Sequence, residues 1–138
     1  MYSIEEASYG FRIVSSGEVS RAEAEKLRLE LMRLMTTQGG PFSMLADLRG
    51  MISAKPEVLE IVGKMQADSK LMSLKRAAII VSSPVVRAQI KQSTFKAGTE
   101  NTDRFIDASQ TDDWETQALA WVEDAVEPVG TLQPLPGK

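Results

Sequence analysis

One short run of residues, Ala77–Val81, constrains the fold more than any other feature of the chain. It contains only small and β-branched apolar residues, and Ser82-Ser83-Pro84 follows it directly. Such an uninterrupted run is typical of a strand that is buried on both faces of a parallel sheet. Serine before proline is a common helix start, with serine as the N-cap and proline as the first helical residue. A buried strand that leads straight into a helix favours an α/β fold.

Strand and helix patterns alternate along most of the chain. Two short segments at the amino-terminal end, separated by a turn at 8–10, predict an antiparallel hairpin. We expect strands at 2–7, 11–15, 42–48, 77–81 and 104–107, and helices at 21–38, from 56 to between 67 and 72, at 85–96, and from near 113 to 125. This order predicts an α/β domain with a single mixed, mostly parallel five-stranded sheet and about four helices. The most continuously apolar strands, 42–48 and 77–81, belong at its centre.

The chain lacks two residue types on which much enzyme chemistry depends. Its 138 residues include no Cys and no His. Their absence excludes disulfides, thiolate nucleophiles, Cys-ligated zinc sites and serine hydrolases with a histidine base. The paired carboxylates Glu5-Glu6 point to opposite faces of a strand, and those of Asp112-Asp113 suit a helix start. We therefore expect a non-catalytic protein with no metal site and no cofactor.

Charge and hydropathy bear on the kinds of partner. The net charge is −3, which gives no global attraction to nucleic acid or to an anionic membrane. No apolar stretch approaches the roughly 20 residues that span a bilayer. Glu5 and Glu6 stand where a signal peptide carries positive charge. We expect a cytoplasmic protein without stable membrane anchoring, whose partner is another protein rather than nucleic acid.

Three segments resemble one known family. They are Phe42–Arg49, then Lys75–Val81, and last Phe105-Ile106-Asp107 with the helix Trp114–Glu123, which carries Trp121 near its end. Together they resemble the STAS-like superfamily, also called SpoIIAA-like after the anti-sigma-factor antagonist, and in particular its uncharacterised bacterial members. The likeness covers about residues 2–126. It implies the SpoIIAA-like topology, related to Sec14 domains, and a function in binding rather than in catalysis.

The resemblance also points to a regulatory region. Anti-sigma-factor antagonists place a phosphorylatable serine in an Asp-Ser-Ser-Gly-like turn after the third strand. Here the turn reads Gly50-Met51-Ile52-Ser53-Ala54, so Ser53 lacks the flanking Asp and Gly. It is either a regulatory residue or an ordinary loop or capping residue. Asp47 ends the third strand, where ligands of open α/β sheets gather. It either contacts a partner, or pairs with Arg49 or another base, or caps a neighbouring loop.

A possible anion site lies at the start of the third helix. Ser82 and Ser83 supply hydroxyls beside free helix amides, and Arg87 adds positive charge. The alternative is an ordinary N-cap followed by a solvated basic face. Neither of the two glycine-rich phosphate fingerprints is present.

Three functions fit these observations. The first is a non-catalytic interaction module that recognises a protein partner or a second copy of itself. The second is a binder of a small apolar or lipid-like ligand in the manner of Sec14, which the seven Met residues favour. The third is an enzyme that uses Asp47, Ser53, Ser82 or Ser83.

Two further expectations concern the surface and the carboxyl-terminal end. Leu29 and Met32 lie off the main apolar stripe of the first helix, which favours a homodimer. In a monomer they would pack against the second helix. The domain is expected to occupy residues 1–127. Proline and glycine after that predict a flexible tail at 128–138.

Overall fold

The structure is a computed structural model of the chain, and it describes residues 1–129. Every expected strand and helix is present. The elements are β1 (Tyr2–Ala7), β2 (Gly10–Ser16), α1 (Arg21–Gln38), β3 (Phe42–Gly50), α2 (Pro56–Leu71), β4 (Leu74–Val81), α3 (Pro84–Ala97), β5 (Asp103–Asp107) and α4 (Trp114–Asp124). β3 and β4 are longer than the apolar runs that predicted them, because β3 pairs with β2 as far as Gly50 and β4 pairs with β3 from Leu74. Within 128–138, Pro128 is buried and the Val129 amide donates to Gln117 Oε1 at 3.0 Å, while 130–138 lies outside the described residues.

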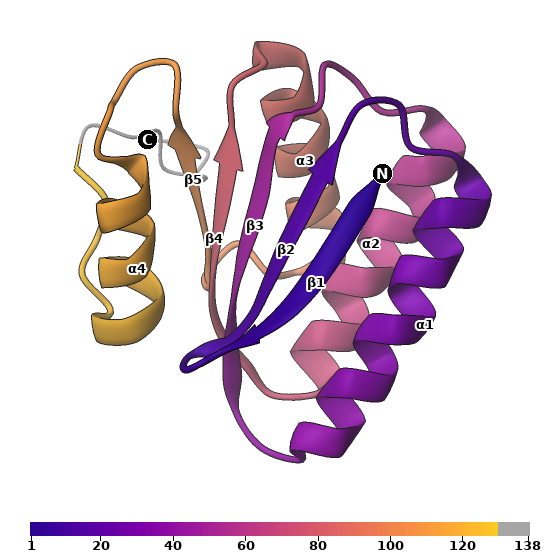
Figure 1. Cartoon of the computed structure of the whole chain (residues 1–138), viewed down its shortest axis with the longest axis horizontal. Coiled ribbons are helices and arrows are strands. Elements are labelled where there is room, and N and C mark those ends of the chain that lie inside the picture. Colours follow the sequence, from indigo (N-terminus) through magenta and orange to yellow (C-terminus); the bar gives the residue numbers. More distant parts are fainter. Residues whose placement is uncertain (130–138) are drawn as a thin grey trace.

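The predicted mixed sheet is confirmed, and its strands follow the chain order β1-β2-β3-β4-β5 (Figure 1). β1 and β2 form the antiparallel hairpin, and each later pair is parallel. β3 is the middle strand and β4 lies beside it, as their apolar runs predict. Because the strands β2 to β5 are parallel, the loops that follow them meet at one edge of the sheet.

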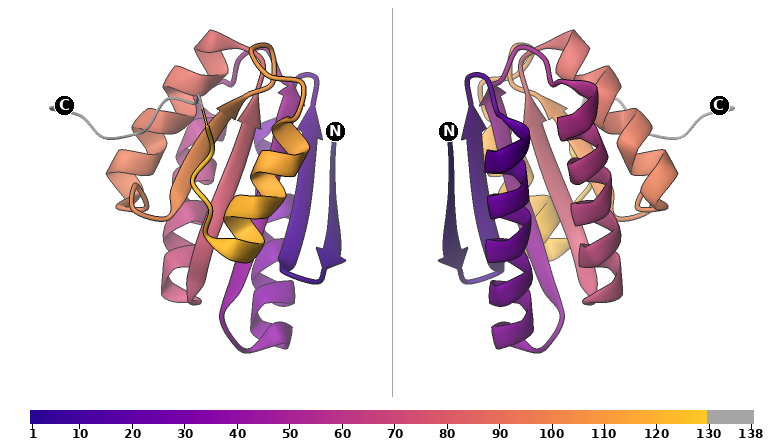
Figure 2. Two further views of the ribbon diagram at one scale, coloured as in Figure 1. Left: turned by 90° about the vertical axis from the view of Figure 1, so that its left-hand side faces the viewer. Right: turned by 90° about the vertical axis from the view of Figure 1, so that its right-hand side faces the viewer.

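Helices cover both faces of the sheet, which explains the continuous apolar runs. Figure 2 shows α1, α2 and α3 on one face and α4 on the other. Side chains of a strand alternate between faces, so β3 sends Met44 to the three-helix side and Leu45 to the α4 side. β4 likewise divides Ile79 and Ile80 between the two cores. Such strands need apolar residues at successive positions.

Local signals fix where the helices start. Ser20 and Glu23 form the capping box that their spacing predicts, with the Glu23 amide 3.1 Å from Ser20 Oγ. Ser83 caps α3, and Pro56 and Pro84 stand at the first helical positions of α2 and α3. Within residues 1–129, no helix combines the length and apolar character needed to cross a membrane.

Candidate functional site

The loops after β3 and β4 form one surface at the edge where the parallel strands end. Ser83 Oγ donates a hydrogen bond of 2.9 Å to the Ile52 carbonyl. The Gln89 side chain bonds both the amide and the carbonyl of Ala54, at 3.0 and 2.9 Å. These bonds tie the β3–α2 loop to the start of α3. The two loops are therefore held in a fixed arrangement.

This edge exposes apolar side chains next to hydroxyls. Ile52 is 79% exposed and Val85 is 52% exposed. Ser53 and Ser82 beside them are also exposed. We call these four residues, Ile52, Ser53, Ser82 and Val85, the strand-end surface. Rigid loops that present branched apolar side chains can bind a partner with little loss of conformational entropy.

Asp47 lies on the α4 side of the sheet, where an ion pair occupies both of its carboxylate oxygens. Arg49 donates from Nε to Oδ1 and from Nη2 to Oδ2, each at 2.9 Å, and its amide adds a bond of 3.1 Å to Oδ1. Burial alone would raise the pKa of Asp47, but the Arg49 hydrogen bonds and charge hold it below its usual range. The Arg49 guanidinium also lies 4.1 Å from the centroid of the Trp114 ring.

The other predicted site residues lie on loops and helix starts. Ser53 does not cap α2, whose N-cap is Lys55 without a side-chain cap. Ser83 Oγ accepts from the Val86 amide at 3.2 Å, so it serves as the N-cap of α3. Arg87 Nη1 lies 3.8 Å from Oδ2 of Asp107, the last residue of the strand β5. The structure thus groups Ser82, Ser83 and Arg87 together, whereas Asp47 is separate.

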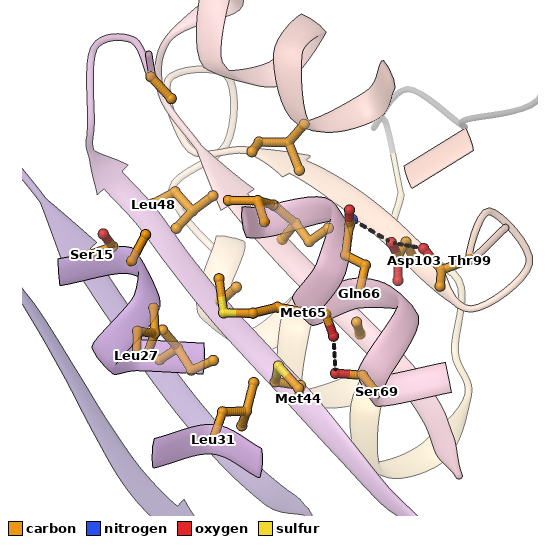
Figure 3. Close-up of a pocket in the computed structure, with 18 of the residues that line it drawn as sticks. Ser15, Leu27, Leu31, Met44, Leu48, Met65, Gln66, Ser69, Thr99 and Asp103 are labelled. Atoms are coloured by element: carbon orange, nitrogen blue, oxygen red, sulfur yellow. Dashed lines mark hydrogen bonds between the residues drawn. The ribbon is translucent and has the colours of Figure 1, made fainter. Parts of the chain in front are cut away.

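A cavity of about 120 Å³ lies between the sheet and the helices α1 and α2 (Figure 3). Its wall is mostly apolar and includes Leu27, Leu31, Met44, Val62, Met65 and Ile79. The volume is comparable to that of an engineered cavity of about 150 Å³ that takes benzene. Two of these residues are methionines, whose flexible side chains suit an adaptable apolar site. This cavity is the second candidate site.

A polar cluster forms part of the cavity wall. Asp103 is 2% exposed, and its Oδ2 accepts from Thr94 at 2.9 Å, Thr99 at 2.8 Å and Gln66 at 3.4 Å. Gln66 Oε1 in turn accepts from Ser93 at 2.6 Å. Burial raises the pKa of Asp103 to about 6, although its hydrogen bonds act in the opposite direction. We call Gln66, Ser93, Thr94, Thr99 and Asp103 the Asp103 cluster.

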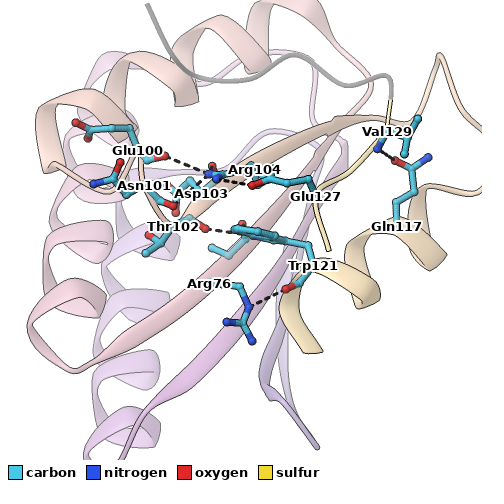
Figure 4. A network of polar contacts seen from close by, with 11 residues as sticks. Arg76, Glu100, Asn101, Thr102, Asp103, Arg104, Gln117, Trp121, Glu127 and Val129 are labelled. Atoms are coloured by element: carbon cyan, nitrogen blue, oxygen red, sulfur yellow. Dashed lines mark hydrogen bonds and ion pairs between the residues drawn. The ribbon is translucent and has the colours of Figure 1, made fainter. Parts of the chain in front are cut away.

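The cation next to Asp103 in the sequence does not neutralise it. Figure 4 shows that Arg104 extends to the α4 side, where it pairs with Glu127. Its guanidinium lies 4.3 Å from the centroid of the Trp121 ring. Trp121 Nε1 donates to the carbonyls of Ala77 and Thr102 at 3.1 and 3.2 Å. Arg104 and Trp121 therefore anchor α4 and the segment after it, and the Asp103 charge stays without a counter-ion from this residue.

The methionines suggested an apolar ligand site, but sequence reasoning did not locate the cavity and gave no indication of the Asp103 cluster. The predicted last strand begins at residue 104, whereas in the structure Asp103 is the first residue of β5. Its partners Gln66, Thr94 and Thr99 come from α2, from α3 and from the loop after α3. The one local signal was the spacing of Thr99 and Asp103, which places a hydroxyl and a carboxylate in a single turn.

Comparison with solved structures shows the SpoIIAA-like fold that the sequence predicts. A structure of the anti-sigma factor antagonist SpoIIAA in its unphosphorylated form matches with a TM-score of 0.56. The match covers 84% of this chain and 96% of that chain, at 12% sequence identity. No family model matches this sequence, and no curated protein matches it either.

Proposed function

We propose that this chain is a non-catalytic regulatory module that binds a protein partner through the strand-end surface. The observation that carries this proposal is the exposure of Ile52 and Val85 on loops that hydrogen bonds hold together. The shared fold supports it, because SpoIIAA is by description an antagonist of an anti-sigma factor. Ser53 is adjacent to Ile52 and exposed, so a phosphate there would add negative charge to the contact surface.

The strand-end surface is tested by adding charge to it. We expect Ile52→Asp to weaken partner binding by about 10- to 100-fold, because an isoleucine buried at an interface contributes ~1.5–3 kcal/mol. Each variant of this chain is immobilised, and the amount of partner that it captures is compared with the amount that the wild-type chain captures. Leu71→Asp is the matched control, since Leu71 is also exposed but lies at the other end of α2. Equal capture by Ile52→Asp and wild type would contradict this assignment.

Self-association is the second form of protein binding that we propose. Met32 packs against the core beneath α1, whereas Leu29 is 73% exposed. Leu29 therefore does not pack against α2, which is where the monomer alternative would place it. An exposed leucine on α1 fits a contact with a second copy of the chain.

We expect Leu29→Glu to convert a homodimer to a monomer without loss of the fold. The reason is that a charge at the centre of an apolar contact stays unpaired in the dimer but is solvated in the monomer. Light scattering at micromolar concentration should give twice the chain mass for wild type and half of that value for the variant. A wild-type protein of single chain mass at high concentration would end the homodimer proposal.

The cavity favours a second candidate function, the binding of a small apolar ligand. Toluene is a suitable probe, because the cavity volume is close to that of a site that takes benzene. We expect saturating toluene to raise the melting temperature and to shift the NMR signals of Met44 and Met65, which line the cavity. Ala46→Leu, which adds three carbons at the cavity wall, should abolish both effects. No response of wild type to toluene would contradict this function.

A further inference from the structure

Asp103 is a buried carboxylate in a mostly apolar cavity wall. None of the ion pairs formed within residues 1–129 includes it. The next residue in the chain, Arg104, pairs with Glu127 and lies over the Trp121 ring on the other face of the sheet. A buried charge without a counter-ion is costly, and hydrogen bonds from neutral donors offset only part of that cost. A ligand with a positive charge would supply the missing counter-ion and so remove this cost.

The carboxylate also keeps room for another hydrogen bond. Thr94, Thr99 and Gln66 all donate to the same oxygen, Oδ2. A carboxylate has about four acceptor sites over its two oxygens, so Oδ1 retains acceptor capacity. Asp103 lines the cavity, and Figure 3 shows it hydrogen bonded to Gln66 and Thr99 along that wall. A ligand in the cavity can therefore reach it with a donor group.

Building on the ligand-binding function proposed above, we propose that the cavity selects a small primary amine with an apolar body, whose ammonium group pairs with Asp103. The volume of about 120 Å³ fits a single aromatic ring rather than a long acyl chain. A ligand carboxylate is disfavoured, because it would place a second negative charge beside the first in a low-dielectric site. Among residues 1–129, Asp103 is the only charged residue that lines the cavity, and its negative sign favours an amine as the ligand.

Four compounds of nearly equal shape test the selection. They are benzylamine, benzyl alcohol, toluene and benzoate, titrated into the full chain at about pH 8, where a carboxylate whose pKa is about 6 is ionised. We expect benzylamine to bind about 10- to 100-fold more tightly than toluene, as charge-assisted hydrogen bonds are the strong ones. Benzyl alcohol should fall between them, and benzoate should not bind.

Two variants separate Asp103 from the rest of the cavity. Asp103→Asn keeps the shape and an acceptor oxygen but removes the charge, so benzylamine and toluene should bind this variant with nearly equal affinity. Ala46→Leu should abolish binding of both compounds, because it fills the cavity. Amide NMR shifts of Thr99 and Asp103 in wild type give a readout that needs no variant. They should move with benzylamine and much less with toluene.

Each contrary result has a distinct meaning. Toluene and benzylamine binding with equal affinity would overturn the amine proposal and leave the ligand-binding function intact. An amine advantage that persists in Asp103→Asn, or amine binding that persists in Ala46→Leu, would place the contact elsewhere on this acidic chain. Failure of all four compounds to bind would overturn both the amine proposal and the ligand-binding function.

Discussion

The variant Ile80→Asp is expected to lose cooperative folding. Ile80 is fully buried in the core between β4 and α4, where it packs near Leu45, Ile106 and Trp121. Truncating an isoleucine there costs about 2–5 kcal/mol, and burying an unpaired polar group adds ~1–3 kcal/mol. The sum approaches the whole stability of a domain, which is about 5–15 kcal/mol. Circular dichroism during urea titration should show no cooperative transition.

The sheet register makes this substitution worse than burial alone. Ile80 pairs across the strands with Asp47, so a new aspartate would stand beside an existing buried carboxylate. Arg49 cannot neutralise both, since its guanidinium already bonds both oxygens of Asp47. Ile52→Asp is the matched control: the same change at an exposed position should alter stability by less than about 0.5 kcal/mol. A cooperatively folded Ile80→Asp protein would contradict the central place of β4.

Most of the fold was predictable because its signals are local. The run Ala77–Val81, the capping pair Ser20 and Glu23, and the Ser83-Pro84 start each depend on residues close in sequence. Right-handed crossovers and sequential pairing then leave few topologies for such an order of strands and helices. Strand ends were harder to predict, since pairing with a neighbouring strand extends β3 and β4 past their apolar cores.

The candidate sites were predictable only where one stretch of chain contains all the partners. Asp47 and Arg49 are two residues apart on a strand, so they share a face and their ion pair could be anticipated. The Asp103 cluster joins α2, α3 and β5, and no spacing in the sequence indicates that they meet. The cavity forms where side chains from two helices and the sheet leave a space unfilled. Its presence is therefore a property of packing alone.

Asp103 should give this protein an unusual dependence of stability on pH. The folded state raises its pKa from the ordinary 3.8 to about 6, so the folded chain holds this proton more tightly than the unfolded chain. The favourable contribution is complete below about pH 4 and is lost as the pH rises through about 6. A shift of this size corresponds to roughly 3 kcal/mol. The lowered pKa values of Glu23, Asp47, Asp113 and Glu127 act in the opposite direction, so the Asp103 effect is isolated by a variant.

Asp103→Asn removes the titration while keeping the size of the side chain. Neutral asparagine resembles the protonated acid, so the two proteins should be closest in stability near pH 4. Between about pH 4 and 8 the variant should gain on wild type by roughly 3 kcal/mol, measured by urea unfolding at each pH. Asp47→Asn is the matched control, because the lowered pKa of Asp47 predicts the opposite sign.

The control variant sharpens the interpretation of the pH series. Asp47→Asn loses the Arg49 pair, so it should be destabilised at neutral pH and should approach wild type only as the pH falls through the lowered pKa of Asp47. Two buried aspartates on opposite faces of one sheet would then show opposite slopes. A stability difference for Asp103→Asn that is flat from about pH 4 to 8 would mean that the carboxylate is compensated in the folded state. The cavity wall would then present no unneutralised negative charge with which the ammonium group of a ligand could pair.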